Sequence, residues 1–160
     1  MRIGLGEDIH RLVKGRKLML AGIEIPSEVG EEAHSDGDVL LHAVADAIYG
    51  AIAEKDIGWH FPDNDPKTEG IDSRLIVKDA LSLAKKKGYA VSSLDSNIFL
   101  EDIKLKPYID EMRKSLASIL ETEIENISIK ARTNEGLGPV GLGQAVRATV
   151  ITLLKEENDD

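Results

Sequence analysis

The sequence predicts a single α+β domain in which helices pack on one face of a mixed β-sheet. Three observations lead to this prediction. A chain of 160 residues suits one domain and can bury an ordinary core without disulfides. No linker, internal repeat or low-complexity segment divides the chain. Segments with the alternation of a strand and segments with the periodicity of a helix are interspersed along it.

Two strands are expected near the start of the chain. Ile3 and Leu5 begin an apolar alternation that reaches Asp8–His10, so we expect this tripeptide at the end of a first strand. Leu18–Ile25 is predicted to be a second strand, which Pro26 stops.

A first helix is predicted over Asp38–Ala53, because this segment is long, rich in Ala and Leu, and free of Pro. Residues 27–38 before it are polar and rich in turn-forming residues. Within that stretch, Ser35 or Asp36 is expected to cap the helix.

The middle of the chain combines a long loop with a second helix. Asp56–Gly70 is dense in Pro, Asp, Asn and Gly, and loops of this length in compact domains are often functional. Ser73–Lys87 has the pattern of an amphipathic helix capped by Ser73 or Asp72. Lysines fill its last turn and Gly88 follows, as the rules for helix C-termini favour.

One further helix and three strands complete the prediction. Tyr89–Leu100 alternates enough for a strand, and Pro107–Glu121 is a third helix with Pro in its first turn. Ile127–Thr133 and Ala145–Leu154 are the final strands.

Composition and charge narrow the class of protein. The chain has no cysteine, which excludes disulfides and Cys-type zinc sites. Its net charge of −9 argues against nonspecific nucleic-acid binding, so a polyanionic ligand would need local positive charge such as a metal ion. No run approaches the ~18 apolar residues of a membrane span, and we expect a cytoplasmic, untargeted enzyme. Glu156–Asp160 is expected to be a frayed acidic tail behind a domain of residues 1–155.

Asp8, His10 and His42 form a candidate metal-ligand set. Residues two apart on a strand, such as Asp8 and His10, point to the same face. Asp38, His42 and Asp46 repeat at steps of four and place a polar stripe on an otherwise apolar helix. Two imidazoles and one carboxylate with an open fourth position are typical of catalytic zinc. The alternative is that these are hydrogen-bonded residues without a metal.

A glycine-rich segment, Gly136–Gly141, matches the G-x-G-x-x-G pattern and raises the hypothesis of a dinucleotide-binding module. Its context argues against that function, because the segment after Gly143 is β-branched and Pro139 is poorly suited to helix entry. We expect a turn between two strands, with a backbone-amide nest or an intersubunit contact as the alternatives.

Short motifs along the chain occur together at a specific spacing. They are Gly6–His10, Ala33–Val39, His42-Ala43, Asp56–Gly58, Phe61–Pro66, Asp72–Arg74, Lys130-Ala131, Thr133–Glu135 and Leu137-Gly138. The HSDGDV segment, and DIG followed by FPDNDP, are highly specific. Together the motifs resemble those of the 2-C-methyl-D-erythritol 2,4-cyclodiphosphate synthase family, over nearly the whole chain from Arg2 to Val150.

The resemblance implies a phosphorus–oxygen lyase of the non-mevalonate isoprenoid pathway. In the implied reaction, the 2-phosphate of 4-diphosphocytidyl-2-C-methyl-D-erythritol 2-phosphate attacks the β-phosphorus, and CMP leaves. The resemblance implies zinc on Asp8, His10 and His42, and a second divalent ion, Mg²⁺ or Mn²⁺, on Glu135. It also implies a homotrimer assembled around the sheets, with sites between neighbouring subunits. The small cytidylyl diphosphate substrate is the expected ligand, with no nucleic acid or membrane partner.

The resemblance also assigns residues around the substrate. His34 and Thr133 would polarise and position the reacting phosphates. The methylerythritol part would be surrounded by His34, Ser35, Asp56, Ile57, Gly58, Phe61, Pro62, Asp63, Asn64 and Asp65. The cytidine diphosphate part would be held by Leu100, Glu101, Asp102, Ile103, Lys104, Leu105, Lys106, Arg132, Thr133, Asn134 and Glu135. Asp8, Ile9, His10, Pro139 and Leu142 complete the candidate substrate-binding residues.

Some positions and hypotheses remain open. We assign Asp46 to orienting the His42 imidazole, with a salt bridge or a solvated helix turn as the alternative. Arg132 and Leu142 depart from the family pattern. A zinc-dependent phosphohydrolase using the same triad is the second hypothesis for function, and a non-catalytic nucleotide-binding protein is the third.

Overall fold

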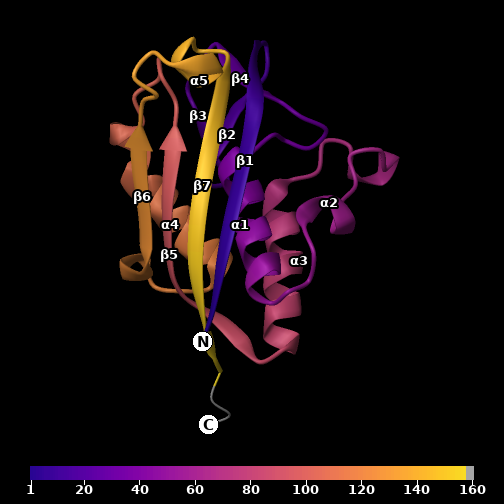
Figure 1. Ribbon diagram of the computed structural model, residues 1–160. Coiled ribbons are helices and arrows are strands. Elements are labelled where there is room, and N and C mark those ends of the chain that lie inside the picture. The colour runs from indigo at the N-terminus through magenta and orange to yellow at the C-terminus, as the bar shows by residue number, and fades with distance from the viewer. Residues whose placement is uncertain (158–160) are drawn as a thin grey trace.

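Five strands form one mixed sheet in the computed structural model, which describes residues 1–157 (Figure 1). Their order across the sheet is β4-β1-β7-β5-β6. β5 and β6 run parallel and the other neighbouring pairs run antiparallel, which confirms the predicted mixed sheet. The strands are β1 (Arg2–Lys14), β4 (Val29–Glu32), β5 (Tyr89–Phe99), β6 (Ile127–Arg132) and β7 (Ala145–Glu156).

Three long helices cover one face of this sheet, as predicted (Figure 1). α1 (Val39–Ala51) lies against β1 and β7, α3 (Ser73–Lys86) packs on α1, and α4 (Ile109–Leu120) packs on α3 and β6. No helix in residues 1–157 is both long and apolar enough to cross a membrane.

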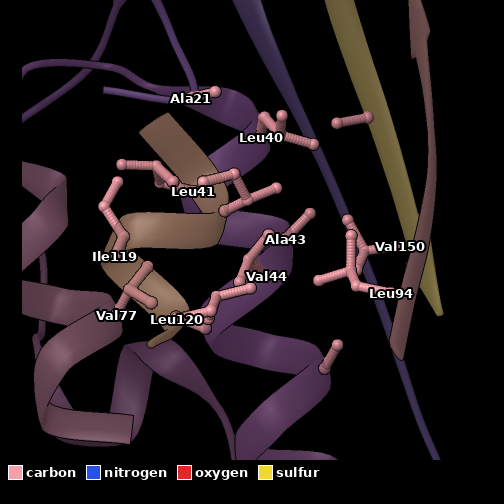
Figure 2. Close-up of a cluster of buried hydrophobic side chains, with 14 of the residues drawn as sticks. Ala21, Leu40, Leu41, Ala43, Val44, Val77, Leu94, Ile119, Leu120 and Val150 are labelled. Atoms are coloured by element: carbon pink, nitrogen blue, oxygen red, sulfur yellow. The ribbon is translucent and has the colours of Figure 1, made fainter. Parts of the chain in front are cut away.

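α1 forms the centre of the hydrophobic core. Figure 2 shows its side chains between two layers, with Leu94 and Val150 on the sheet side and Leu120 on the helix side. Leu41 and Val44 of α1 are fully buried there. Full burial of one such side chain contributes roughly 1.5–3 kcal/mol, so the buried residues of α1 help to hold the helices and the sheet together.

Two glycines allow α1 to lie directly on β1. A Cβ atom on Gly4 would stand 1.8 Å from the Ala47 carbonyl oxygen, and one on Gly6 would stand 1.9 Å from the Ala43 carbonyl oxygen. Both positions therefore exclude any side chain, and the close approach brings the neighbouring residues of β1 within reach of α1.

The alternate residues of β1 point away from the helices. Ile3, Leu5 and Ile9 are 66%, 67% and 52% exposed, and Ile151 of the adjacent β7 is 44% exposed. The apolar side chains whose alternation predicted this strand therefore point outward, and with Ile151 they form an exposed apolar sheet face.

Most predicted elements agree with the structure to within two residues. α3, β5, β6 and β7 lie where the sequence predicted them. Asp72 caps α3 by accepting the N–H of Arg74, and Gly88 adopts a φ of +80° after the helix ends. α4 begins at Ile109, two residues after the predicted start, because Pro107 and Tyr108 belong to a 3-10 helix, Lys106–Tyr108.

The predicted single strand Leu18–Ile25 is wrong. It is a hairpin of β2 (Leu18–Leu20) and β3 (Ile23–Ile25). The turn residues Ala21 and Gly22 have φ values of 56° and 77°. Because this turn contains no polar residue, the hairpin has the apolar profile of one uninterrupted strand.

β1 and the segment after the hairpin also differ from the prediction. β1 continues past His10 to Lys14, and this extension pairs with β4 inside the segment predicted to be only turns. The helix cap is Asp38, whose Oδ1 accepts the N–H of Leu41, in place of Ser35 or Asp36.

The two segments predicted as loops each contain a short helix. Asp56–Gly70 includes α2 (Ile57–His60) and a 3-10 turn at Pro66–Thr68. The glycine-rich segment lies between β6 and β7, as predicted, but Gly138–Gly141 forms one helical turn, α5. Pro139 is compatible with it because a fixed φ suits the first turn of a helix. At the C-terminus, β7 includes Glu156, and the rest of the predicted tail beyond residue 157 lies outside the described residues.

Candidate active site

The structure brings Asp8, His10 and His42 together, as the sequence predicts. β1 carries the first two and α1 carries the third. Asp8 Oδ2 lies 2.9 Å from His10 Nε2 and 3.1 Å from His42 Nδ1. One ligand atom from each residue lies within 4.8 Å of the other two. Since α1 can approach β1 only over the glycines described above, the fold itself creates this cluster.

The contacts within the cluster keep Asp8 ionised and orient the His10 ring. Burial alone would raise the pKa of Asp8, but hydrogen bonds with His10 and His42 outweigh it and hold the pKa well below its usual range. His10 Nδ1 donates to the Gly37 carbonyl oxygen at 2.7 Å, so its Nε2 is the nitrogen that faces the carboxylate. An ionised carboxylate and two oriented imidazoles fit the ligand set of a catalytic zinc site.

A cavity of about 270 Å³ opens beside the triad. Several residues assigned by resemblance to the methylerythritol part line it. They are His34, Ser35, Ile57, Gly58, Phe61 and Asp63. The other residues that line the cavity were not predicted: Glu32, Ala33, Thr68, Ile71 and Ile76. The wall therefore comes from β4, α2, the loops on either side of these elements, and α3.

The remaining predicted residues of the loop support this wall. Asp56 caps α2 by accepting the N–H of Trp59. The Asp65 carbonyl oxygen accepts a hydrogen bond from His34 Nε2 at 2.9 Å, which sets the orientation of the His34 ring. Pro62 and Asn64 are exposed beside it.

Arg16 and Glu31, which the sequence analysis did not identify, stabilise the segment that contains His34 through hydrogen bonds to the backbone. The Arg16 guanidinium donates to the carbonyl oxygens of Glu31, Ala33 and Ser35 at 3.0, 3.3 and 3.1 Å. Glu31 is fully buried. Its carboxyl oxygens accept the backbone N–H groups of Met19 and Val39. Burial and the nearby Asp38 raise the pKa of Glu31 to about 9. Nothing in the local pattern of the sequence distinguishes these residues from surface charges.

The residues assigned to cytidine diphosphate lie elsewhere in the chain, where β5 and β6 end. The Glu101 carboxylate accepts the N–H groups of Asn134 and Gly136 at 2.7 and 2.9 Å, so it joins the loops after these two strands. Thr133 Oγ1 accepts the N–H of Glu135, whose φ is 53°. Both of these side chains are exposed. Leu142 is 68% exposed at the end of α5.

Thr133 and Glu135 do not reach the triad within one chain. The register aligns Asp8 with Ala148, Ile98 and Ala131 on β7, β5 and β6. Three strand spacings, about 14 Å, therefore separate β1 from β6. Figure 1 shows β6 at the far edge of the sheet.

The role predicted for Asp46 is corrected by the structure. Its Oδ1 accepts the N–H of Ile57 at 3.0 Å, and no hydrogen bond joins it to His42 within residues 1–157. The His42 ring instead contacts Ser35 and Ser73 through Nε2. Asp46 lies one turn along α1 from His42, level with the start of α2, so it supports α2 and not the imidazole.

The fold and the site together define an α+β protein with a candidate metal centre beside a cavity. The chain belongs to the YgbB family, whose model matches residues 1–155. The resemblance stated from the sequence motifs is confirmed by the relatives of the chain. It is 49% identical over 156 residues to the 2-C-methyl-D-erythritol 2,4-cyclodiphosphate synthase of Chloroherpeton thalassium, which covers 98% of this chain and 99% of the relative.

Solved structures agree with this assignment. A structure of a 2C-methyl-D-erythritol-2,4-cyclodiphosphate synthase matches 96% of this chain and 100% of its own, with a TM-score of 0.89 and 40% identity. A CDP-bound form of such a synthase matches with the same coverage and TM-score at 38% identity. These relatives support the synthase hypothesis over the phosphohydrolase and nucleotide-binding alternatives.

Proposed function

We propose that this chain is a cytoplasmic enzyme that converts 4-diphosphocytidyl-2-C-methyl-D-erythritol 2-phosphate to 2-C-methyl-D-erythritol 2,4-cyclodiphosphate and CMP. An oxygen of the 2-phosphate forms a bond to the β-phosphorus. The bond from the β-phosphorus to the oxygen bridging it to the α-phosphate breaks, and that oxygen leaves with CMP. The observation that carries the proposal is the convergence of Asp8, His10 and His42 beside a cavity lined by His34, in a chain that is nearly half identical to the synthases.

The chemistry needs little covalent participation from the protein. The attacking phosphate is already ionised at neutral pH, so neither a protein nucleophile nor a general base is required. The protein must fold a flexible polyanion for in-line attack and offset its charge. We assign His34, whose ring is fixed by the Asp65 carbonyl, and Thr133 to positioning the reacting phosphates.

Two divalent ions are part of the proposal. Zinc would be held by Asp8, His10 and His42, and Mg²⁺ or Mn²⁺ by Glu135. When bound, the ions supply positive charge beside the reacting phosphates. Glu135 has the hard oxygen ligand that Mg²⁺ and Mn²⁺ prefer, and its carboxylate is exposed.

We expect Glu135→Gln to weaken the second ion only. Neutralising a carboxylate removes charge from an oxygen site, so the Mg²⁺ concentration for half-maximal rate should rise roughly tenfold or more. Steady-state rates over a Mg²⁺ titration measure this shift, with zinc content determined in parallel and expected to stay unchanged. Glu111→Gln, an exposed carboxylate in the first turn of α4, is the control. An unaltered Mg²⁺ and Mn²⁺ dependence in Glu135→Gln would exclude its role as a ligand.

The assembly we propose is a homotrimer with each active site between two subunits. Within one chain, the triad and Thr133 lie about three strand spacings apart, and in this proposal a neighbouring subunit supplies Thr133 to the site. The exposed apolar sheet face of Ile3, Leu5, Ile9 and Ile151 offers a surface for such contacts. Sedimentation analysis should give about three times the 17.4 kDa of the chain.

Product analysis tests the function directly. The zinc- and Mg²⁺-loaded protein is incubated with the cytidylyl substrate and the products are followed by phosphorus NMR. We expect CMP and the cyclic diphosphate in equal amounts. CMP with linear phosphorylated products would indicate the phosphohydrolase, and the absence of turnover would indicate a binding protein.

A further inference from the structure

The His42 imidazole is connected on the side away from Asp8 to a second carboxylate. Its Nε2 lies 2.9 Å from Ser73 Oγ and 3.0 Å from Ser35 Oγ. Ser73 Oγ in turn lies 2.5 Å from Asp36 Oδ1. Ser73 is fully buried, and Ser35 and His42 are 7% and 9% exposed. A continuous chain of hydrogen bonds therefore runs from Asp36 through Ser73 to the imidazole.

The direction of each hydrogen bond in this chain follows from the donors around it. Both oxygens of Asp36 accept backbone N–H groups, from Asp38 and from Ser73, so this carboxyl group acts as an acceptor. The Ser73 hydroxyl therefore donates to Asp36 and presents a lone pair to His42 Nε2. Ser35 Oγ accepts the N–H of Gly37 and lies beside the same nitrogen. Because the single hydroxyl proton of Ser73 goes to Asp36, this hydroxyl must accept from Nε2, which therefore carries a proton.

We infer that Asp36 and Ser73 are positioning residues that keep a proton on His42 Nε2, so that Nδ1, which faces Asp8 Oδ2, is the nitrogen left to bind the metal. The inference rests on the proposed function, in which His42 is a metal ligand. The arrangement at His42 complements that at His10, whose Nδ1 donates to the Gly37 carbonyl so that Nε2 is left for the metal. The loop of residues 35–38 and the first residue of α3 thereby orient both imidazoles. Partners of this kind fix the ring and raise its basicity as a ligand.

Ser73→Ala tests the role of the relay in metal binding. Zinc affinity, measured by competition with a chelator, should fall by about 10–100-fold. Ala suits the first turn of α3, where the backbone N–H of residue 73 keeps its bond to Asp36. The control is Ser96→Ala, which removes an equally buried hydroxyl that donates to the Ser128 carbonyl, on β5. Affinity within twofold of wild type in Ser73→Ala, or an equal loss in Ser96→Ala, would overturn the inference.

The tautomer itself can be measured in the wild-type protein, so the inference does not depend on how Ser73→Ala folds. Long-range nitrogen–proton NMR correlations of protein labelled with ¹⁵N-histidine distinguish Nδ1 from Nε2. We expect a proton on His42 Nε2 both in the zinc-loaded protein and in metal-free protein at pH 9. A proton on Nδ1 with a bare Nε2 would refute the relay. Failure of the wild type to bind zinc would instead contradict the proposed metal site, while the metal-free spectrum would still decide the tautomer.

Discussion

His42→Ala is expected to abolish zinc binding and to lower turnover by about three orders of magnitude or more, while the chain still folds. Removal of one of three ligands leaves too few protein donors for a tightly held zinc ion. The charge supplied by a bound ion contributes several kcal/mol to transition-state stabilisation, and about 1.4 kcal/mol corresponds to a tenfold change in rate. Metal analysis of the purified variant and single-turnover rates measure the two effects.

The variant should remain folded because the losses are local. Ser35 and Ser73 lose one hydrogen-bond partner, at a cost of about 1–3 kcal/mol, which ordinary domain stability exceeds. His60→Ala is the matched control. Its imidazole stacks on Tyr49 and bonds the Glu54 carbonyl, outside the triad, so zinc should be retained. Full zinc content in His42→Ala would refute the metal assignment.

Gly6→Ala should destabilise the protein by about 3 kcal/mol or more, at the upper end of the cost of overpacking. The added Cβ would stand 1.9 Å from the Ala43 carbonyl oxygen, so α1 would have to move away from β1. That shift would also separate Asp8 from His42. Urea unfolding of the metal-free protein, followed by circular dichroism, gives the change in free energy.

Gly50→Ala is the control for this substitution. Gly50 lies within α1, and its nearest neighbour for an added Cβ is the Leu5 carbonyl oxygen at 3.8 Å. Alanine there should stabilise the protein by about 0.5–1 kcal/mol, because glycine is a poor helix former. Wild-type stability in Gly6→Ala would mean that β1 and α1 are not in close contact.

Hydrophobic periodicity correctly predicted the helices and strands that bury one face and expose the other. α3, β5 and β7 each bury one clear face, so their boundaries could be predicted from the sequence. The β2–β3 hairpin could not, since Ala21 and Gly22 form a turn without polar residues. β4 was missed because it is short and its glutamates resemble loop residues: Glu32 is exposed at the sheet edge, while buried Glu31 is satisfied by backbone N–H groups that no local pattern reveals.

Part of the candidate site could be predicted because the regular geometry of a strand relates two of its residues. The two-residue period of a strand placed Asp8 and His10 on one face, and the motif spacing identified the family. The partner of His42 could not be predicted, because Ser73 lies 31 positions away and reaches the imidazole only through the packing of α3 on α1. The helical period suggested Asp46 instead, but it predicts neighbours on one helix and not those across an interface.

Subunit complementation tests the composite active site most directly. In such a site, the metal ligands of one subunit lie beside Thr133 and Glu135 of the next. His42→Ala lacks the metal site, and a second variant carrying Thr133→Val with Glu135→Ala lacks the other half. Each should be inactive alone. Equal amounts, unfolded and refolded together with zinc and Mg²⁺, should recover about a quarter of wild-type activity, since each mixed ring of three contains one intact interface. If mixed trimers form, as native mass spectrometry would show, but activity stays at the level of the separate variants, the composite site is contradicted.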